Sequence, residues 1–241
     1  GNFLKPAASH KTSLVGTEEI AHGTAAFRLK KPAGFSYTAG QAVYVTLPGQ
    51  KEGDSKGRVR AFTLASAPHE PELLIATRMT DTAFKRHLAG LPAGSPVSIE
   101  GPYGDLTLDA GTAPVVFLAS GIGITPFRSM ILDAAERGHR RDVTLFYSNR
   151  GAADAAFLPE LEQLARDNPW FRLVATMTDA DSWPGERGYF SREMIERHAG
   201  NIGETVFYLA GPPAMVAATE VLLKDAGVSA RNIRAEEFTG Y

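Results

Sequence analysis

The stretch APVVFLASGIGITPFRSM, residues 113–130, decides how the rest of this chain is interpreted. It opens with an apolar, β-branched run, Val115 to Leu118, whose length suits a buried strand better than a helix. Gly121 and Gly123 then permit the positive φ and the close backbone approach that a tight turn from strand to helix needs. Pro126 suits a first helical turn, where its missing N–H costs nothing. The stretch therefore predicts a helix that begins above the end of a strand.

A helix N-terminus placed in this way attracts anions. Its unpaired N–H groups and partial positive charge favour a phosphate in particular. The pattern here, G-x-G-x-x-P, lacks the third glycine of the usual dinucleotide fingerprint, and a strand, glycine turn and helix also occur simply as structure. Taken alone, the stretch leaves nucleotide binding and a structural turn both open.

Composition narrows the class of protein. The chain has 241 residues, enough for two domains of ordinary size, and 44% apolar with 22% charged residues is typical of a globular protein. A formal net charge of −2 argues against a general nucleic-acid binder. The absence of cysteine removes disulfides, thiolate nucleophiles, iron–sulfur clusters and cysteine zinc sites. Any redox chemistry must therefore come from a bound cofactor.

The sequence gives no sign of a metal site, a membrane span or a signal peptide. The six histidines stand singly and predict no metal site. No apolar run reaches the length of a membrane span and no signal peptide is visible, so the expected location is cytoplasmic. The chain begins Gly1-Asn2, and an expression remnant or a piece of a longer protein are both open interpretations. The oligomeric state is left open.

The first half of the chain has the short, alternating runs of an antiparallel β-barrel. Residues 53–60 predict a mobile hairpin loop, and one helix is expected at 82–88 with Thr82 as its N-cap. The expected strands are residues 13–15, 24–29, 42–47, 60–64, 73–77 and 97–99.

The second half alternates strand and helix, which predicts an α/β doubly wound parallel sheet. Gly138 and Gly227 are placed as helix C-caps. The expected domains are residues 1–109 and 110–241. In the second, the expected strands are residues 115–119, 143–147, 171–177, 206–209 and 233–238, and the helices 126–137, 156–166, 191–198 and 212–226.

Five motifs in order then resemble the ferredoxin–NADP reductase superfamily. Arg60-Ala61-Phe62-Thr63 resembles its flavin-binding motif of arginine, any residue, an aromatic, and serine or threonine. The others are the stretches 37–41 (YTAGQ), 101–104 (GPYG), 119–126 (ASGIGITP) and 210–215 (AGPPAM). The resemblance covers nearly the whole chain and implies an FAD-binding barrel followed by an NAD(P)-binding domain.

The resemblance implies FAD contacts in the first domain. Arg60 offers a planar fork of donors suited to a pyrophosphate. Phe62 is expected to lie against the isoalloxazine ring, and Thr63 to hydrogen-bond the ring and take part in catalysis. Thr77, at a strand end, and Thr82, at the helix start, complete the expected FAD contacts, although Thr82 is also explained as a plain N-cap.

It implies nucleotide contacts in the second domain. The glycine turn would admit the pyrophosphate, and Thr125 would stand near the contact between flavin and nicotinamide as a catalytic residue. Ser148 and Arg150 would reach a 2′-phosphate, which gives a weak preference for NADPH over NADH. The expected cofactor-binding residues of this domain are Gly121, Gly123, Pro126, Ser148, Arg150, Gly211, Pro212 and Met215. The family's cysteine before Gly211 is Ala210 here, which puts the rate of hydride transfer in doubt.

The carboxyl end, AEEF at 235–238, resembles the family's terminal motif of glutamate, any residue and an aromatic. Phe238 is the candidate ring over the flavin, with Tyr241 as the alternative. Glu236 is expected to position or move a proton. The alternative is a purely structural role, in which these aromatic rings cover the core at the last strand.

The expected activity is that of an FAD-dependent NAD(P)H oxidoreductase that passes electrons to a separate acceptor such as a ferredoxin, a flavodoxin or an oxygenase component. Two alternatives stay open. One is an NAD(P)H:flavin reductase that holds flavin loosely, against which the Arg60 contact counts. The other is a regulatory module that binds nucleotide without turnover, suggested by Ala210.

Overall fold

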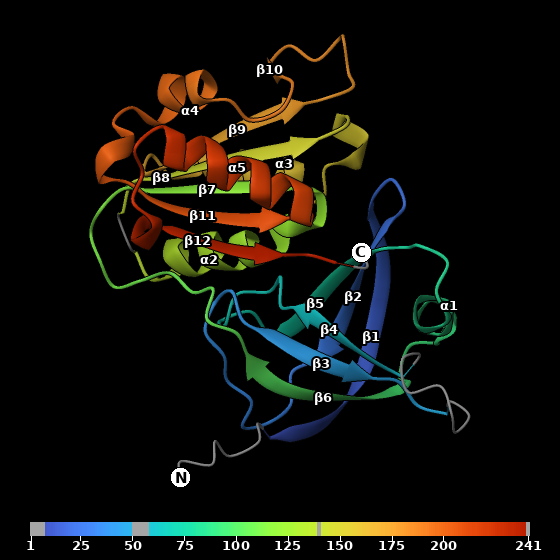
Figure 1. The fold of residues 1–241 in the computed structure, drawn as a ribbon. Helices are drawn as coiled ribbons and strands as arrows, with labels where there is room; N and C mark the ends of the chain where they lie inside the picture. Colours follow the sequence, from blue (N-terminus) through green and yellow to red (C-terminus); the bar gives the residue numbers. More distant parts are fainter. Residues whose placement is uncertain (1–7, 50–57, 139–140, 240–241) are drawn as a thin grey trace.

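The computed structural model describes residues 8–49, 58–138 and 141–239, and they form two lobes (Figure 1). The first lobe is built on a six-stranded antiparallel sheet in the order β4-β3-β6-β1-β2-β5. Its elements are β1 (Ser9–Ala21), β2 (Thr24–Lys30), β3 (Ala42–Thr46), β4 (Val59–Thr63), β5 (Glu72–Arg78), α1 (Ala83–Gly90) and β6 (Pro96–Tyr103).

The expected barrel is confirmed as a barrel-like sheet, with one difference. The strand order runs from β4 to β5 without a ladder between them. The sheet curls enough for the Ala65 N–H, just after β4, to donate to the carbonyl of Leu74 on β5 at 2.8 Å. Phe27, Val45 and Ile99 are fully buried inside the curl, because alternate residues of each strand face inward.

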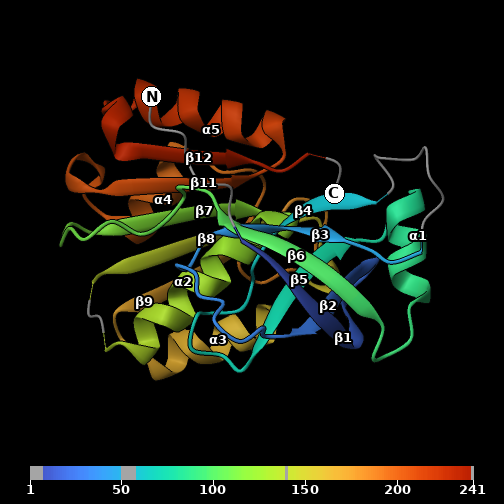
Figure 2. The same ribbon diagram turned by 90° about the horizontal axis from the view of Figure 1, so that it is seen from below.

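The second lobe is a six-stranded parallel sheet in the order β10-β9-β8-β7-β11-β12. Alternate residues of its strands enter two different core clusters, so both faces are covered by helices. α2 and α3 cover one face, and α4 and α5 the other (Figures 1 and 2). Its elements are β7 (Val115–Ser120), α2 (Ile124–Glu136), β8 (Val143–Asn149), α3 (Leu158–Asp167), β9 (Phe171–Met177), β10 (Glu186–Arg187), α4 (Arg192–Ala199), β11 (Val206–Gly211), α5 (Pro213–Asp225) and β12 (Ile233–Glu237).

Most of the predicted elements are present. β1 is much longer than expected, and the two-residue strand β10 was not predicted. Gly138 and Gly227 have positive φ at the ends of α2 and α5, as expected of C-caps. The predicted loop at 53–60 lies mostly outside the described residues.

Polar and apolar contacts join the two lobes. The Ser129 hydroxyl of α2 donates to the Ser66 carbonyl at 2.8 Å, and the His22 N–H in the β1–β2 turn donates to the Ala153 carbonyl at 2.8 Å. Arg128 of α2 is 6% exposed and reaches the Ala65 carbonyl, also at 2.8 Å.

The segment 104–114 connects the lobes, and a domain boundary at residues 109–110 stays a prediction.

Within the described part of the chain, no helix combines the length and the apolar character that crossing a membrane requires.

Candidate functional site

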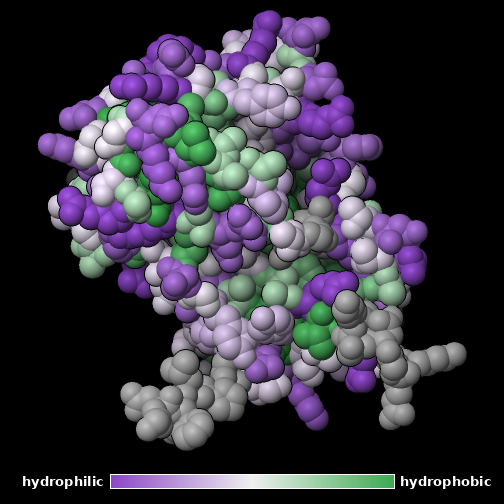
Figure 3. Space-filling model, in the orientation of Figure 1, coloured by the Kyte–Doolittle hydropathy of each residue, from purple (hydrophilic) through white to green (hydrophobic). Residues whose placement is uncertain are grey.

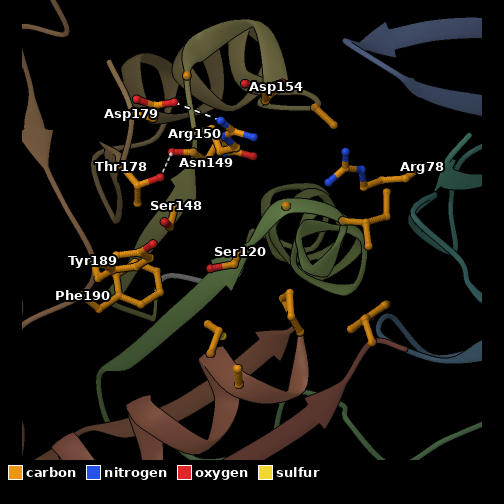
Figure 4. A pocket seen from close by; sticks show the side chains of 18 of the residues that line it. Arg78, Ser120, Ser148, Asn149, Arg150, Asp154, Thr178, Asp179, Tyr189 and Phe190 are labelled. Carbon is orange, nitrogen blue, oxygen red and sulfur yellow. Dashed lines mark hydrogen bonds and ion pairs between the residues drawn. The ribbon is translucent and has the colours of Figure 1, made fainter. Parts of the chain in front are cut away.

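A pocket of about 1000 Å³ lies between the two lobes. The first lobe contributes His22, Thr24 and Arg78 to its lining, and the second contributes residues that follow β7, β8 and β9 and the first turns of α5 (Figure 4). In the space-filling view, green and white atoms lie at the junction of the lobes, below a more purple upper surface (Figure 3).

The pocket sits where the strand order of the parallel sheet reverses. Successive strands run outward from β7 to β8 and β9 on one side, whereas β11 and β12 lie on the other side. Such a reversal opens a crevice at the carboxyl ends of the strands, because the connecting helices leave toward opposite faces. The turns after β7 and β11 therefore flank the crevice.

Gly121 and Gly123, in the turn after β7, each require glycine for a different physical reason. Gly121 has φ +55°, a conformation that L side chains rarely adopt, and it lines the pocket. Gly123 has an ordinary φ of −59°, but a Cβ on it would lie 2.1 Å from the carbonyl oxygen of Ala210 on β11. Gly121 thus supplies the positive φ and Gly123 the close approach, whereas the sequence pattern had suggested both properties for the pair together.

The turn after β11 forms the opposite wall. A Cβ on Gly211 would lie 3.0 Å from Met215 Sδ and 3.3 Å from Ser120 Cβ, so this glycine keeps a narrow space between β7 and α5. Pro212 is the N-cap residue of α5, and Pro212 and Met215 both line the pocket. Ala210, in contrast, is fully buried.

The ends of β8 and β9 provide the polar part of the lining. Arg150 pairs with Asp179, with Nη2 3.0 Å from Oδ2, and both side chains are exposed (Figure 4). Ser148 and Asp154 line the same region. The buried Nδ2 of Asn149 has no hydrogen-bond partner among the described residues, and this residue also lines the pocket. This amide is suited to donate to the oxygens of a nucleotide. Asn149 was not predicted as a site residue, because an asparagine after a strand is common.

A second polar region lies on the first lobe at the start of α1. Thr82 is the N-cap of α1, and its hydroxyl accepts from the Lys85 N–H at 3.2 Å. Arg60 is exposed on β4, and the rings of Phe62 on β4 and Phe84 on α1 lie 5.7 Å apart, which places strand and helix side by side. Cations beside a helix N-terminus fit the diphosphate of FAD.

Several of the expected contacts involve buried side chains, and these contacts stay predictions. Phe62 is 2% exposed in the barrel core, so its ring does not present an open face to a flavin. Thr77 is fully buried and its hydroxyl points at the Arg78 carbonyl, 3.4 Å away. Thr125 is 1% exposed and donates to the Ile122 carbonyl at 3.1 Å, so it closes the turn before α2 and does not face the pocket. Pro126 is buried in the first turn of α2 and is absent from the pocket lining.

The remaining predictions for the FAD side and the carboxyl end have mixed outcomes. Thr63 is 5% exposed, and its contact with flavin stays a prediction. Phe238 lines the pocket and is packed into the core below it, and its N–H donates to the Gly211 carbonyl at 2.8 Å. Its place over the flavin and its place as a core cap both stay predictions. Tyr241 lies outside the described residues.

Glu236 is a partly buried carboxyl at the junction of the lobes. It pairs in register with Ala210, and its Oε2 has no hydrogen-bond partner among the described residues. Burial, and after it the nearby charge of Asp105, raises the pKa of Glu236 above the ordinary carboxyl value. The side chain is thus suited to hold a proton, while its catalytic role stays a prediction.

We expect the substitution Glu236→Gln to stabilise the protein at neutral pH. Because the folded carboxyl binds its proton more tightly than the unfolded one, the stability of the native protein falls as pH rises from the ordinary carboxyl pKa through the raised folded pKa. Glutamine has no such loss, so the variant gains about 1.4 kcal/mol for each unit of upward shift once pH exceeds the folded pKa. Urea unfolding as a function of pH measures this.

The matched control for this measurement is the exposed neighbour, Glu237→Gln. The stability difference between Glu236→Gln and the native protein should vanish below the ordinary carboxyl pKa. A difference that is constant across pH would contradict the assignment.

Comparison with known proteins agrees with the two lobes. Residues 11–108 match the family described as Oxidoreductase FAD-binding domain, and residues 117–221 match Oxidoreductase NAD-binding domain. A curated relative is a subunit of the Na(+)-translocating NADH-quinone reductase of Klebsiella pneumoniae, 32% identical over 200 residues that cover 76% of this chain and 49% of the relative. Its counterpart in Neisseria gonorrhoeae is 30% identical over the same shares. The chain thus spans about half the length of the curated relatives it matches.

Solved structures share the fold. The cytochrome P450 reductase GcoB from Amycolatopsis is 26% identical, with a TM-score of 0.83 over 96% of this chain and 71% of that chain. A ferredoxin NADP+ reductase from Neisseria gonorrhoeae with bound FAD and NADP is 23% identical, with a TM-score of 0.80 over 95% of this chain and 98% of that chain.

A barrel-like lobe that matches the FAD-binding family, followed by a parallel-sheet lobe that matches the NAD-binding family, defines the class as an FAD- and NAD-binding oxidoreductase. The FAD-binding match precedes the NAD-binding match along the same chain, and this order identifies the family. The chain belongs to the ferredoxin–NADP reductase superfamily, and its cofactors are FAD and a nicotinamide nucleotide.

Proposed function

We propose that this chain is an NADH-preferring reductase that loads FAD with electrons and passes them to a separate acceptor protein or domain. Bound FAD supplies the redox chemistry, since flavin accepts a hydride from reduced nicotinamide and releases electrons singly or in pairs. The side chains serve to hold the two cofactors in contact and to choose the nucleotide.

The observation that carries the choice of NADH is the environment of Arg150. This arginine is the candidate partner of a 2′-phosphate, but it already pairs with Asp179 at 3.0 Å, and Asp154 lines the same part of the pocket. The other arginine of the lining, Arg78, comes from β5 of the first lobe and lies to the right of Arg150 in Figure 4. A 2′-phosphate would meet two carboxylates beside one paired cation, whereas the 2′-hydroxyl of NADH can donate to a carboxylate.

The rest of the pocket supports a dinucleotide of either kind. Gly121 and Gly211 open the walls of the crevice to a pyrophosphate or a ring. Met215 and Phe238 provide apolar surface near the carboxyl end of β11. These residues do not distinguish NADH from NADPH. The selectivity is therefore determined by the residues at the ends of β8 and β9.

Anaerobic titration with each nucleotide tests the proposal. NADH should bleach the visible absorbance of the bound flavin at a lower concentration than NADPH. Asp179→Asn should reduce this preference by about five- to tenfold, because exposed charge–charge terms amount to about 1 kcal/mol. Asp181→Asn, an exposed aspartate two residues further on and outside the lining, is the matched control.

Two outcomes would overturn the proposal. A preference for NADPH that Asp179→Asn leaves unchanged would assign Arg150 to the 2′-phosphate. Flavin that neither nucleotide bleaches would favour a regulatory module, the alternative that Ala210 raised.

The acceptor is proposed on chemical grounds. These 241 residues contain no cysteine, so they hold no cysteine-ligated iron–sulfur cluster. The curated relatives, which are named as subunits of an NADH-quinone reductase, are about twice as long as the matched region. Electrons therefore leave to a group held elsewhere. Rapid NADH-dependent reduction of ferricyanide, with slow reduction of added free riboflavin, would support this view over the flavin reductase alternative.

A further inference from the structure

The linker between the lobes, residues 104–114, leads from β6 to β7 and is held at both of its ends (Figure 1). At its start, the Gly104 carbonyl accepts from the Gln41 side-chain amide at 3.0 Å. Leu106 is 6% exposed, and a Cβ on Gly40 would lie 2.0 Å from the Leu106 carbonyl oxygen. The start of the linker is therefore packed closely against the first lobe.

The other end of the linker is bound to the second lobe through Asp109. Its carboxylate accepts from Arg141 Nη1 at 2.6 Å and from Arg234 Nη1 at 2.9 Å. Its backbone N–H donates to the Tyr208 hydroxyl at 3.1 Å, and its carbonyl accepts from Arg141 Nη1 at 3.0 Å. This one residue thus uses its side chain and both of its main-chain polar groups to hold the linker.

The three partners of Asp109 belong to the framework of the parallel sheet. Tyr208, on β11, is fully buried. Arg234, on β12, donates from Nη1 to the Tyr208 hydroxyl at 2.5 Å, and its Cζ lies 5.3 Å from the centroid of that ring. Arg141, two residues before β8, is 6% exposed and donates from Nε to the Ala113 carbonyl at 2.5 Å. The linker is therefore tied to elements that cannot shift without disturbing the sheet.

The charge of Asp109 is matched by its surroundings. Burial acts against its ionisation, but the hydrogen bonds from Arg141 and Arg234 lower the pKa of Asp109 below the ordinary carboxyl value. Hydrogen bonds between ionised groups are stronger than those between neutral ones. Loss of the carboxylate would also leave the buried guanidinium of Arg141 without this partner, so the anchor depends on Asp109.

The two sets of contacts leave a short segment between them. Only Thr107 and Leu108 lie between Leu106, which is held by the first lobe, and Asp109, which is held by the second. A change in the relative orientation of two lobes is absorbed by a few backbone positions of this kind. Release of Asp109 would lengthen the free part of the linker toward Ala113. Because Arg128 and Ser129 also join the lobes, we expect the lobes to tilt and not to separate.

We propose that Asp109 is a positioning residue for hydride transfer, because it fixes the linker that sets the orientation of the second lobe on the first. The pocket takes lining residues from both lobes, so its shape follows their orientation. A misplacement of about 1 Å can slow a reaction by about a hundredfold. The inference rests on the proposed reductase activity and does not depend on the choice between NADH and NADPH.

The rate of flavin reduction in the FAD-loaded full chain tests the first part of this proposal. Asp109→Asn is mixed anaerobically with increasing concentrations of NADH, and loss of the flavin absorbance is followed by stopped flow. The limiting rate should fall about ten- to hundredfold. The NADH concentration that gives half of this rate should change less than twofold, because the turns of the second lobe supply much of the pocket lining.

A distance measurement tests the orientation of the lobes directly. The chain contains no cysteine, so Lys11→Cys on β1 and Lys224→Cys on α5 provide two sites for spin labels. Pulsed electron paramagnetic resonance then gives the distribution of distances between the lobes. Asp109→Asn should broaden or shift this distribution. The result does not require the flavin to be reduced.

Three further variants make the result specific. Tyr208→Phe removes the hydroxyl that accepts from the Asp109 N–H, and it should lower the limiting rate by a smaller factor; it also replaces Asp109→Asn if that variant does not fold. Asp109→Glu keeps the charge and should restore much of the rate. Asp142→Asn, which removes one partner of the exposed pair with Arg172, is the matched control and should change neither measurement.

An unchanged limiting rate or an unchanged distance distribution in Asp109→Asn would overturn the proposal. A higher half-saturating concentration of NADH with an unchanged limiting rate would also overturn it, because Asp109 would then act on nucleotide binding. Native flavin that neither nucleotide bleaches would instead contradict the proposed reductase activity. The distance measurement would still decide whether Asp109 sets the orientation of the lobes.

Discussion

Substitution of Gly123 by alanine is expected to lower the free energy of unfolding by about 3 kcal/mol or more, although it adds a single methyl group. The backbone of Gly123 is in the ordinary helical region, so conformational strain is not the cause. The new Cβ would lie 2.1 Å from the Ala210 oxygen, 2.4 Å from its carbonyl carbon and 2.8 Å from the Gly211 nitrogen.

All three of these atoms belong to the backbone of β11, which is held between β7 and β12 by the ladders of the sheet. A flexible side chain could rotate away, but a central strand cannot. The start of α2 would have to move instead, and it forms one edge of the nucleotide crevice. We therefore expect weaker NADH binding together with the loss of stability.

Urea unfolding and anaerobic titration with NADH measure these two effects. The matched control is Gly90→Ala at the end of α1, where an added Cβ would meet nothing within 4 Å and φ is not positive. This control should change stability by less than about 0.5 kcal/mol. Similar stability of the two alanine variants would show that β11 and α2 separate easily.

Substitution of Arg128 by methionine is expected to lower the free energy of unfolding by about 3 kcal/mol. The guanidinium is almost fully buried between the lobes. Its Nε lies 2.7 Å from Glu160 Oε1, and its Nη1 lies 3.0 Å from Glu70 Oε1 and 2.8 Å from the Ala65 carbonyl oxygen. Methionine fills much of the volume but leaves these acceptors without their donor.

The loss should be partly reversible by a second change. Glu160→Gln in the Arg128→Met background removes one of the two carboxylates that would then face each other, so it should recover part of the stability. Arg137→Met is the matched control on the same helix, because its pair with Asp133 is exposed and worth less than about 0.5 kcal/mol. If Arg128→Met and Arg137→Met have equal effects on urea unfolding, the contact does not join the lobes energetically.

Much of the fold follows from local patterns in the sequence. The β-branched run before Gly121 and the strand–helix alternation after it predict the parallel sheet, because each element buries a face set by its own periodicity. Caps such as Thr82 and Ser191 act within four residues, so they are also visible in the sequence. The motifs assigned the FAD-binding and nucleotide-binding halves in their correct order.

The site was only partly predictable. Glycines at turns and the polar ends of β8 are marked by sequence, but the direction of a side chain is not. Phe62, Thr77 and Thr125 were expected at the cofactors; the structure buries all three, and their contacts with the cofactors stay predictions. A motif gives the residue type at a position, whereas burial depends on elements packed against it from elsewhere in the chain.

The sequence by itself determined the class of protein, the order of its two lobes and the turns that form the crevice, because these depend on residues close together in the chain. Only the tertiary structure decided which charges meet. It placed Asp179 against Arg150, and Arg128 between Glu70 and Glu160. Such encounters join strands and helices that are distant in sequence, and electrostatic interactions depend on distance and burial, which no local pattern records.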